Sequence, residues 1–387
     1  MTFDVIIVGG GLAGAALAVA LRRSHLKIAL IEARAPMPPE SWDQRIYAYS
    51  PASARFLEEL GIWRHLDATR LTRVAEMRIF GDAGGALRFS AYDSGLSELA
   101  WIGESSLVHL ELWQSLKRQH NVELLCPARC ESLKFDSDCA VLRLKDGQTL
   151  RARLVVGADG RDSWVRQQAG IRAKISPYGE RGVVANFRCE RPHDNTAFQW
   201  FFDEGILAWL PLPDGQMSMV WSAPDALADE LMAMDEAAFC ARVAAAGDSL
   251  LGQLELRTPR AAFPLQLMRV GEIVRPRLAL IGDAAHAIHP LSGHGINLGF
   301  MDAKALAERL SSLPAWRDVG EIDVLRAYAR ARAEEPFMLQ YLTHGLNQLF
   351  GARNPLLGLA RNAGMNLTNR LPVVANALVR YAANGRL

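Results

Sequence analysis

A run of glycines near the start of the chain has the spacing of a phosphate-binding turn. The run is Gly9-Gly10-Gly11-Leu12-Ala13-Gly14, between a short apolar segment, 3–8, and a stretch rich in Ala and Leu, 13–24. In a strand–turn–helix unit, Gly9 permits the tight turn, Gly11 lets the main chain approach a pyrophosphate, and Gly14 lets helix and strand pack closely. The helix N-terminus then offers N–H donors and a partial positive charge. A glycine turn without a ligand is the competing interpretation.

Glu32 ends a second short apolar segment, 27–31, which would place a parallel strand beside the first. A carboxylate at this point can accept hydrogen bonds from both ribose hydroxyls of an adenosine group. The same charge would repel a 2′-phosphate, which argues against NADPH at this site. Together the two features predict a dinucleotide-binding βαβ unit of about thirty residues.

A second candidate turn follows an apolar segment that ends near Val156. It reads Gly157-Ala158-Asp159-Gly160-Arg161-Asp162-Ser163, with Arg166 beyond it. A strand that ends in such a turn and continues as a helix can contribute to a nucleotide site. An ordinary strand-to-helix loop, with Ser163 or Asp162 as the helix N-cap, explains the same residues. The segment alone favours neither interpretation.

A third turn begins with Gly282 and Asp283, at the end of the apolar segment 277–282. Asp283 can bind a ribityl hydroxyl, and the residues from Pro290 to Gly295 would bring bare main chain close to a flat ring. A helix predicted from about Ile296 would point its N-terminus at that ring. Such a dipole stabilises the negative charge of a reduced flavin by about 0.5–2 kcal/mol.

Three histidines, His286, His289 and His294, accompany the third turn. They have no cysteine or carboxylate cluster with them, so a metal site is a poor interpretation. Local hydrogen bonding explains them without any ligand. His289 and His294 are also the nearest titratable groups by motif position that could help to deprotonate a phenol.

Length and composition narrow the class of protein. The chain has 387 residues, enough for about two domains, and a formal net charge of +1, so no bulk field recruits nucleic acid or an acidic partner. Its five scattered cysteines disfavour a disulfide framework or a zinc site and favour a reducing cytoplasm. No signal peptide and no apolar run of roughly 18 residues is visible, so we expect any membrane contact to be peripheral.

The remaining segments predict an α/β fold. Hydrophobic patterns predict helices over 53–65 and 107–119, a hairpin over 74–89, and strands over 122–125, 130–135, 140–144 and 149–156. An aromatic, β-rich stretch, 183–222, predicts a second sheet. The chain after Val324 is expected to be helical.

The order of these segments predicts domains built from discontinuous pieces. We expect a Rossmann-like cofactor-binding domain of residues 1–73, 100–180 and 265–335. An inserted β-sheet substrate domain would consist of residues 74–99 and 181–264. Residues 336–387 would form a C-terminal helical tail.

The three turns, in this order, resemble those of the class A flavoprotein monooxygenases, the family of p-hydroxybenzoate hydroxylase, and imply its FAD-binding fold. Within that family, Trp42-Asp43-Gln44-Arg45-Ile46-Tyr47-Ala48-Tyr49-Ser50-Pro51-Ala52-Ser53 is similar to the D-x-R-x-x-A-x-S-P-x-S segment of the ubiquinone-biosynthesis hydroxylases. The segments 282–290 and 297–303 are similar to the same subfamily. The resemblance covers about residues 3–340.

The resemblance implies FAD as cofactor and a role for each site residue. The ADP half would be held by Gly9, Gly11, Leu12, Ala13, Gly14 and Glu32. Arg45 would lie along the flavin, and Asp159 and Gly160 form the motif that family members use for both FAD and NAD(P)H. Gly282 and Asp283 would meet the ribityl or pyrophosphate group. The isoalloxazine would be lined by Pro290, Gly293, His294, Gly295, Ile296 and Asn297. The subfamily usually has Gln where His294 stands, and His109 lies near a point where many relatives place Arg or Gln against the flavin.

The implied reaction uses NAD(P)H and O₂ to transfer one oxygen atom to an electron-rich aromatic ring. The leading hypothesis is hydroxylation of a polyprenyl phenol in ubiquinone biosynthesis, with a protein complex of that pathway as an expected partner. Hydroxylation of a soluble phenol is the alternative. A prenyl-chain reductase or a halogenase shares the opening fingerprint, but the W-x-W-x-I-P segment of halogenases is missing. A non-enzymatic escort would not need three glycine-cleared turns, and an NAD dehydrogenase has no use for the third.

The aromatic residues between Phe198 and Trp221 have two interpretations. The reaction site must exclude water, and this stretch is a candidate cover over the flavin. The competing interpretation is a hydrophobic core face.

The C-terminal tail also has two interpretations. After Glu335 the chain has no acidic residue, and it has arginines at 353, 361, 370, 380 and 386 among many apolar residues. Such a tail suits the inner face of the cytoplasmic membrane, where a polyprenyl substrate would reside. An amphipathic helix packed on the body or on a second subunit explains the same pattern.

Overall fold

The computed structural model describes residues 1–39, 41–287, 295–351, 355–369, 371, 376 and 379, with only the main chain for 340, 342–344, 346–348, 350, 351 and 355–360. The first sheet has eight strands, with the central order β18-β19-β11-β1-β2-β8 and with β10 and β9 attached to β11. Its strands are β1 (Thr2–Val8), β2 (Ile28–Ile31), β8 (Val122–Leu125), β9 (Cys130–Phe135), β10 (Ala140–Leu144), β11 (Thr149–Gly157), β18 (Val274–Arg275) and β19 (Leu278–Leu280). The predicted strands in this part of the chain are confirmed to within two residues.

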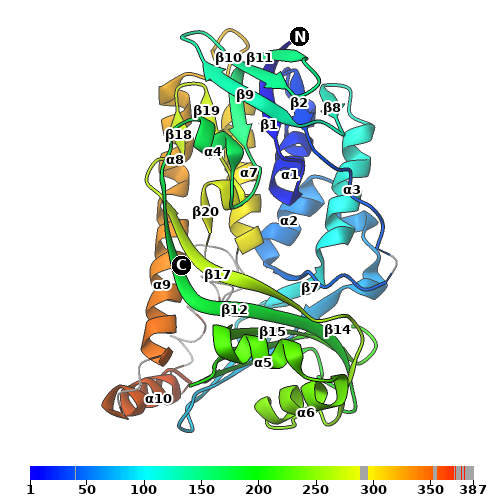
Figure 1. Ribbon diagram of the computed structural model, residues 1–387, viewed down its shortest axis with the longest axis vertical. Coiled ribbons are helices and arrows are strands. Elements are labelled where there is room, and N and C mark those ends of the chain that lie inside the picture. The colour runs from blue at the N-terminus through cyan, green and yellow to red at the C-terminus, as the bar shows by residue number, and fades with distance from the viewer. Residues whose placement is uncertain are drawn as a thin grey trace.

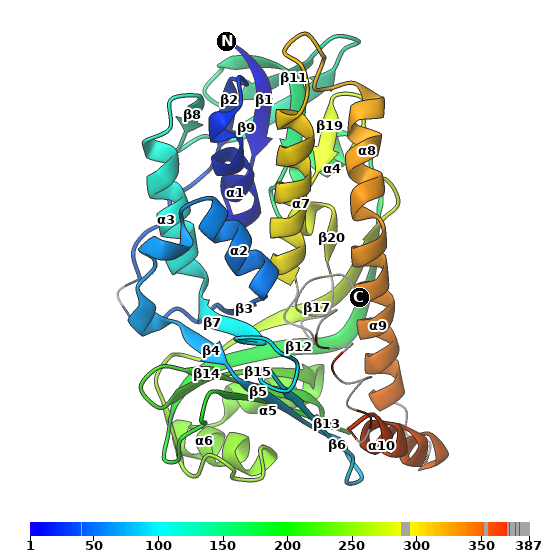
Figure 2. The same cartoon turned by 180° about the vertical axis from the view of Figure 1, so that it is seen from behind.

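Successive side chains along the central strands point to opposite faces of the first sheet, and each face is covered by a hydrophobic core. Val5 and Ile7 point into a cluster with helices, whereas Ile6 and Val8 point into a cluster with β9 and β10. The helices of the first cluster are α1 (Leu12–Ala20), α2 (Pro51–Glu59), α3 (Ser105–Lys117), α7 (Gly295–Ser311) and α8 (Ile322–Arg332). Figure 2 shows α1, α3 and α7 across this face.

The second sheet has nine strands, with the order β20-β17-β12-β15-β14-β13-β5-β6 and with β16 attached to β12. Its strands are β5 (Glu76–Phe80), β6 (Ala86–Ser90), β12 (Ala173–Cys189), β13 (Thr196–Phe202), β14 (Gly205–Leu212), β15 (Gln216–Pro224), β16 (Leu254–Leu256), β17 (Ala261–Val270) and β20 (His286–Ala287). The predicted aromatic sheet and the hairpin of β5 and β6 are confirmed. Figure 1 shows this sheet below the first, with α5 (Asp225–Ala233) and α6 (Glu236–Ala246) on the face turned away from the first sheet.

Two strands continue from the second sheet toward the first. β12 and β17 pair with each other over 173–177 and again over 181–184, with an irregularity between the two stretches. Gly179, with a φ of +71°, lies at this irregularity. The predicted domain boundaries at 180 and 264 therefore fall inside continuous strands, and the division into domains stays a prediction.

A third, small sheet and the last helices complete the described residues. The sheet contains β3 (Ile46–Tyr49), β7 (Ala100–Glu104) and β4 (Thr72–Val74). The chain after Val324 is helical where it is described, apart from isolated residues, in α8, α9 (Glu334–Gly351) and α10 (Pro355–Asn369). None of the helices in the described ranges is long and apolar enough to cross a membrane.

Candidate active site

The three glycine-containing turns and Glu32 lie at one edge of the first sheet. Strands β19, β11, β1, β2 and β8 are parallel to their neighbours, so their carboxyl ends meet at a single edge. Gly9 follows β1, Glu32 follows β2, and Ala158 follows β11, while Gly282 comes two residues after β19. Ligands of open α/β sheets bind at this edge, and all three predicted turns are located there.

The first and second turns are in contact. Gly9 has a φ of +103°, and a Cβ built on it would lie 2.4 Å from the carbonyl oxygen of Ala158. A Cβ on Gly14 would lie 2.0 Å from the carbonyl oxygen of Gly9. Glycine is therefore required at both positions, because a side chain at Gly9 would push the two turns apart and one at Gly14 would push α1 away from the first turn.

The third turn packs against the first helix. Gly282 has a φ of +58°, and a Cβ built on it would lie 3.2 Å from the Cβ of Ala13. A Cβ built on Gly299, in α7, would lie 3.4 Å from the same Cβ of Ala13 and 3.4 Å from the Cα of Gly282. Small residues thus bring α1, α7 and the third turn together, so the three turns form one continuous surface.

Two buried charged residues hold this arrangement. Arg166, in the short helix α4 (Trp164–Gln168), donates from Nη1 to the carbonyl oxygen of Ala284 at 2.9 Å and so ties the second turn to the third. Asp302, in α7, accepts a hydrogen bond from the amide of Gly282 at 3.0 Å. Its side chain is fully buried.

Asp302 is the centre of a buried ionic network. Its Oδ2 also accepts from His286 Nε2 at 2.7 Å, and its Oδ1 accepts from Arg332 Nε at 2.8 Å. Arg332 in turn donates to Glu335 at 2.6 Å. Burial alone would raise the pKa of Asp302, but the charges of His286 and Arg332 outweigh it and hold that pKa below its usual value. Sequence reasoning assigned no role to Asp302, although a carboxylate within the largely apolar stretch 296–303 was the available signal.

Glu32 and His109 both bind the glycine turn. The Glu32 carboxylate accepts hydrogen bonds from the amides of Gly10, at 2.7 Å, and Arg34, at 3.1 Å. His109 Nε2 donates to the carbonyl oxygen of Gly10 at 2.7 Å. The carboxylate is thus fixed in orientation at the end of β2, and His109, on α3, touches the main chain of the first turn.

The first turn fits the pyrophosphate of a dinucleotide. Helix α1 has no side-chain hydrogen bond at its N-cap, Gly11, so no capping side chain occupies the first N–H groups of the helix. A Cβ built on Gly11 would meet no atom within 4 Å. Glycine at this point therefore serves access to the main chain rather than internal packing, as a phosphate site requires.

A shallow hollow lies beside Glu32, at the same sheet edge. It measures about 260 Å³ and is lined by Ala33, Pro127, Ala128, Arg129, Lys145 and Asp146. The amide of Ala128, in its lining, donates to the carbonyl oxygen of Glu32 at 2.8 Å, so the hollow adjoins the end of β2, where the adenosine end of the same ligand is expected.

The side chain of Asp159 forms hydrogen bonds to residues just after it in the chain. It accepts hydrogen bonds from Ser163 Oγ at 2.5 Å and from the amide of Val165 at 3.0 Å. Ser163 is the N-cap of α4 and accepts from the amide of Arg166, which confirms one of the two capping assignments. Burial raises the pKa of Asp159, and these hydrogen bonds oppose that shift. Gly160 has a φ of +82°, and a Cβ on it would meet nothing within 4 Å.

Asp283, Tyr47 and Arg45 lie around one point. Enclosure by protein raises the pKa of Asp283, which the charges of His286 and Arg161 oppose. Its side chain nevertheless reaches solvent, so we expect it to be ionised at neutral pH. Burial raises the pKa of Tyr47, as does the charge of Asp283, while the charge of Arg45 lowers it. Arg45 is exposed, and the segment 42–53 thus reaches the third turn.

Asn297 connects α7 to that same segment. Its Nδ2 donates to the carbonyl oxygen of Ala48 at 2.8 Å, and its Oδ1 accepts from the amide of Ser50 at 2.9 Å. Gly295 and Ile296 form the start of α7, as predicted. His289, Pro290, Gly293 and His294 lie outside the described residues.

Most large aromatic residues of the second sheet point away from the first sheet, and Phe201, which packs with Ile206, is an exception. Trp200, Trp209 and Trp221 belong to a buried cluster with Phe239 and other residues of α5 and α6. These helices lie below the sheet in Figure 1, on the face turned away from the first sheet, so the suggestion that the aromatics cover the flavin is wrong for Phe198, Trp200, Trp209 and Trp221. Alternation along the strands sends only their neighbours to the other side.

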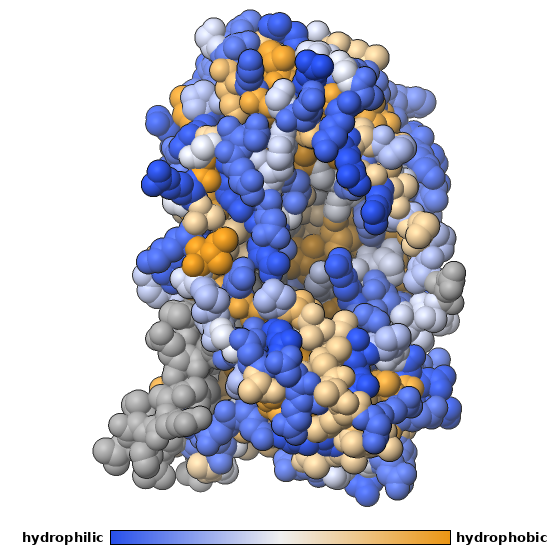
Figure 3. Space-filling model, viewed as in Figure 1, coloured by the Kyte–Doolittle hydropathy of each residue, from blue (hydrophilic) through white to orange (hydrophobic). Residues whose placement is uncertain are grey.

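The inner face of the second sheet, opposite α5 and α6, carries smaller residues. Val184, Val220, Ala208 and Gln199 stand side by side across β12, β15, β14 and β13. On the same face, Ala197 and Leu212 pack against Ile46 and Ile102 of the third sheet. Figure 3 shows an apolar-floored hollow on the front of the molecule, between the upper and lower parts.

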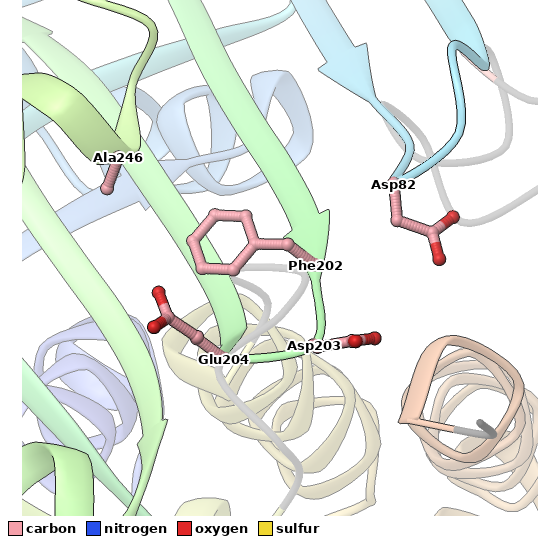
Figure 4. Close-up of a pocket in the computed structure, with 5 residues that line it drawn as sticks. All are labelled: Asp82, Phe202, Asp203, Glu204 and Ala246. Atoms are coloured by element: carbon pink, nitrogen blue, oxygen red, sulfur yellow. The ribbon is translucent and has the colours of Figure 1, made fainter.

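Another surface hollow lies far along the second sheet. It measures about 410 Å³ and is lined by Asp82, Phe202, Asp203, Glu204 and Ala246. Figure 4 shows the carboxylate of Asp82 turned away from Phe202. This hollow contains none of the residues of the three turns.

Known proteins match the chain over almost its whole length. A family model described as FAD binding domain matches residues 2–337. 3-Demethoxyubiquinol 3-hydroxylase of Escherichia coli (strain K12) is 34% identical and is covered to 98%, as is this chain. Ubiquinone hydroxylase UbiL of Rhodospirillum rubrum is 33% identical, over 98% of this chain and 89% of UbiL. The structure of PqsL from Pseudomonas aeruginosa, described as a probable FAD-dependent monooxygenase, is 25% identical, with a TM-score of 0.79 over 94% of this chain and 99% of PqsL. The chain therefore belongs to the FAD-binding-domain family, as an FAD-dependent monooxygenase with the fold of the p-hydroxybenzoate hydroxylase type.

Proposed function

We propose that this enzyme hydroxylates the aromatic ring of a polyprenyl phenol, an intermediate of ubiquinone biosynthesis, with NAD(P)H and O₂ as co-substrates. The observation that carries this proposal is the full-length similarity to relatives whose names specify ubiquinone or demethoxyubiquinol hydroxylation. The apolar-floored hollow between the upper and lower parts of the molecule supports it, because a prenyl chain needs apolar surface.

The three turns would hold FAD in an extended form. Gly9, Gly11, Leu12, Ala13 and Gly14 would hold the pyrophosphate with main-chain amides at the start of α1. Glu32, oriented by the amide of Gly10, would accept the ribose hydroxyls. When bound, the flavin supplies the electron transfer and the activation of O₂ that the protein's own side chains cannot provide.

The remaining residues would position and shield the reacting end. Asp283 would bind the ribityl chain, and Arg45 would neutralise charge at the flavin edge next to Tyr47. Asp159 and Gly160 would line the cofactor through their main chain, since the Asp159 carboxylate is engaged with α4. Gly295, Ile296 and Asn297 would present the N-terminus of α7. Roles for Pro290, Gly293, His289 and His294 remain predictions from the sequence.

The test separates the cofactor from the substrate. Purified protein should bind FAD and oxidise NAD(P)H faster when a prenylated phenol is added, with a product heavier by one oxygen atom. A soluble phenol lacking the prenyl chain serves as the comparison. Stimulation by the soluble phenol alone would refute the prenylated substrate. Deletion of the gene under aerobic growth should lead to accumulation of the unhydroxylated quinone precursor.

We also propose that the C-terminal segment brings the enzyme to an anionic membrane surface at the cytoplasmic side. Arg361 does not take part, because its side chain is 4% exposed and pairs with Asp82. The sequence places further arginines at 370, 380 and 386. Replacing these three by Gln should weaken partition onto anionic vesicles, whereas partition onto neutral vesicles should not change. Equal partition of both proteins onto anionic vesicles would refute membrane contact through the tail. Assembly with other proteins of the pathway stays a prediction.

A further inference from the structure

Helix α10 binds the free edge of the second sheet through a row of asparagines. Strand β6 is the last strand of that sheet. Three strand-side amides donate to asparagine Oδ1 atoms on one face of the helix: Gly85 to Asn362 at 2.8 Å, Ala86 to Asn366 at 3.0 Å, and Arg88 to Asn369 at 3.0 Å. We call these three asparagines the asparagine ladder. It replaces the carbonyl groups that a neighbouring strand would offer, and so it protects an edge that would otherwise pair with other chains.

The hairpin between β5 and β6 is shaped to admit this helix. A Cβ built on Gly81 or on Gly85 would lie 2.3 Å from Oδ1 of Asn362. Gly81 and Gly85 have ordinary backbone angles, since neither is among the residues with positive φ. Their lack of a side chain is therefore explained by the approach of Asn362, about 280 residues away in sequence, rather than by the turn.

An ion pair fixes the same contact. Arg361 pairs with Asp82 at the tip of the hairpin, and its Nη1 donates to the carbonyl oxygen of Leu349 in α9 at 2.7 Å. Asn362 Nδ2 also donates to Asp82 Oδ1 at 2.8 Å. The hydrogen bonds of Arg361 lower the pKa of Asp82, so this carboxylate is ionised at neutral pH. Glycines, asparagines and an ion pair thus specify one docked position for α10.

The docked helix reaches the inner face of the second sheet. Met365 packs with Ile79 against Phe201 and Ile206. Ile79 is paired with Gln199, and through Ala208 and Val220 the same row continues to Val184. Four strand spacings of about 4.8 Å separate Ile79 from Val184, or about 19 Å. Met365 therefore stands at the far end of the row Val184, Val220, Ala208, Gln199 and Ile79, in which Gln199 is the one polar residue.

We propose that α10 is the far wall of the substrate site and that Met365 contacts the apolar substituent of the aromatic substrate. This inference rests on the proposed function, since it concerns how the same site selects its substrate. A ring held at the cofactor edge can extend a long substituent along the inner face, over Val220 and Ala208, until it reaches Met365. A short substituent ends before that point. The helix would therefore determine a preference for long apolar substituents and would leave the ring and the cofactor unaffected.

The experiment compares two phenols that differ only in the length of an isoprenoid side chain. Their binding to the FAD-loaded protein is measured from the perturbation of the flavin absorbance, without NAD(P)H, and turnover is measured separately. Met365→Ala should weaken binding of the long-chain phenol about tenfold, because it removes methylene-sized groups from an apolar contact. Binding of the short-chain phenol and of FAD should not change.

Leu367→Ala is the matched control, because Leu367 lies on the same helix and is 59% exposed. It should change neither phenol. Hydrogen exchange at the amides of Ala86 and Arg88 reports whether α10 is docked in each variant. As a positive reference, Asn366→Ala should speed exchange at Ala86 about tenfold through loss of its acceptor.

The outcomes are distinct. Equal effects of Met365→Ala on both phenols, or none on either, with α10 still docked, would overturn the role of Met365. Binding of both phenols by the unchanged protein without any hydroxylated product would overturn the proposed function alone, and the comparison of binding would still decide the role of Met365.

Discussion

Replacement of Asp302 by Ala should weaken both the fold and the binding of FAD. The carboxylate accepts from the Gly282 amide, His286 and Arg332, and the side chains of Asp302, His286 and Arg332 are at least nine-tenths buried. Removing one member of a buried ionic network leaves its partners uncompensated, at a cost of about 3–5 kcal/mol in the free energy of unfolding. Asp302→Asn should recover only part of this, because an amide offers one acceptor oxygen where three donors converge.

The expected change in the Kd for FAD follows from the hydrogen bond between the Gly282 amide and Asp302 alone. Loss of an anionic acceptor for this amide should cost about 1.5–3 kcal/mol in holding the third turn, which corresponds to a Kd for FAD that is about 10–150 times higher. Quenching of flavin fluorescence on titration into apo-protein measures this Kd, and thermal unfolding of apo-protein measures stability. Glu308→Ala, at an exposed position of the same helix, is the control.

Two results would refute this reasoning in different ways. If Asp302→Ala matched Glu308→Ala in both measurements, the buried network would have no energetic role. If stability fell while the Kd for FAD stayed the same, Asp302 would support the fold but would not position the turn.

Three further predictions follow from the same site. Burial lowers the pKa of His286, but the charge of Asp302 outweighs burial and raises that pKa above 6.5. The His286–Asp302 pair should therefore stabilise the fold fully below about pH 6.5, and this stabilisation should be lost as pH rises through the raised pKa. The free energy of unfolding of apo-protein between pH 6 and 9 should show this loss, and that of His286→Asn should not. Gly11→Ala should fold like the unchanged protein but bind FAD at least about tenfold more weakly, whereas Gly9→Ala should yield little folded protein; circular dichroism and flavin titration distinguish them, and normal FAD binding by Gly11→Ala would argue against a pyrophosphate there. Glu32→Gln should weaken FAD binding by about 1–3 kcal/mol with little change in unfolding, and an unchanged Kd would exclude the ribose contact.

The parts of the site that depend on local spacing were predictable. Gly9, Gly14 and Glu32 lie within one βαβ unit, and short-range sterics determine what such a unit can be. β1 and β11 end in uninterrupted apolar runs, 5–8 and 154–157, because both faces of a parallel sheet are buried there. Turns at the ends of such strands had to share one edge, although the sequence did not show which strands are neighbours.

The features that were missed depend on contacts between distant residues. The single tryptophans of β13, β14 and β15 all point to one face of the sheet, but the alternation of residues along a strand does not reveal which face meets α5 and α6. The role of Asp302 could not be predicted, because its partners His286 and Arg332 lie in other parts of the chain and meet it only in the folded structure. The hairpin over 74–89 was predicted, but the reason for glycine at positions 81 and 85 was not, because Asn362, which approaches both, is remote in sequence.

The paired strands β12 and β17 connect the part of the enzyme built on the first sheet to the part built on the second sheet and restrict motion between them. Both crossings between the sheets at this point are strands hydrogen-bonded to each other, so no slack segment is available there for a swinging motion. Any opening must be a bend of the ribbon, most easily at Gly179. A fragment cut at either crossing would expose a long unpaired edge prone to self-association, so fusion partners are better placed at the N-terminus than between the halves.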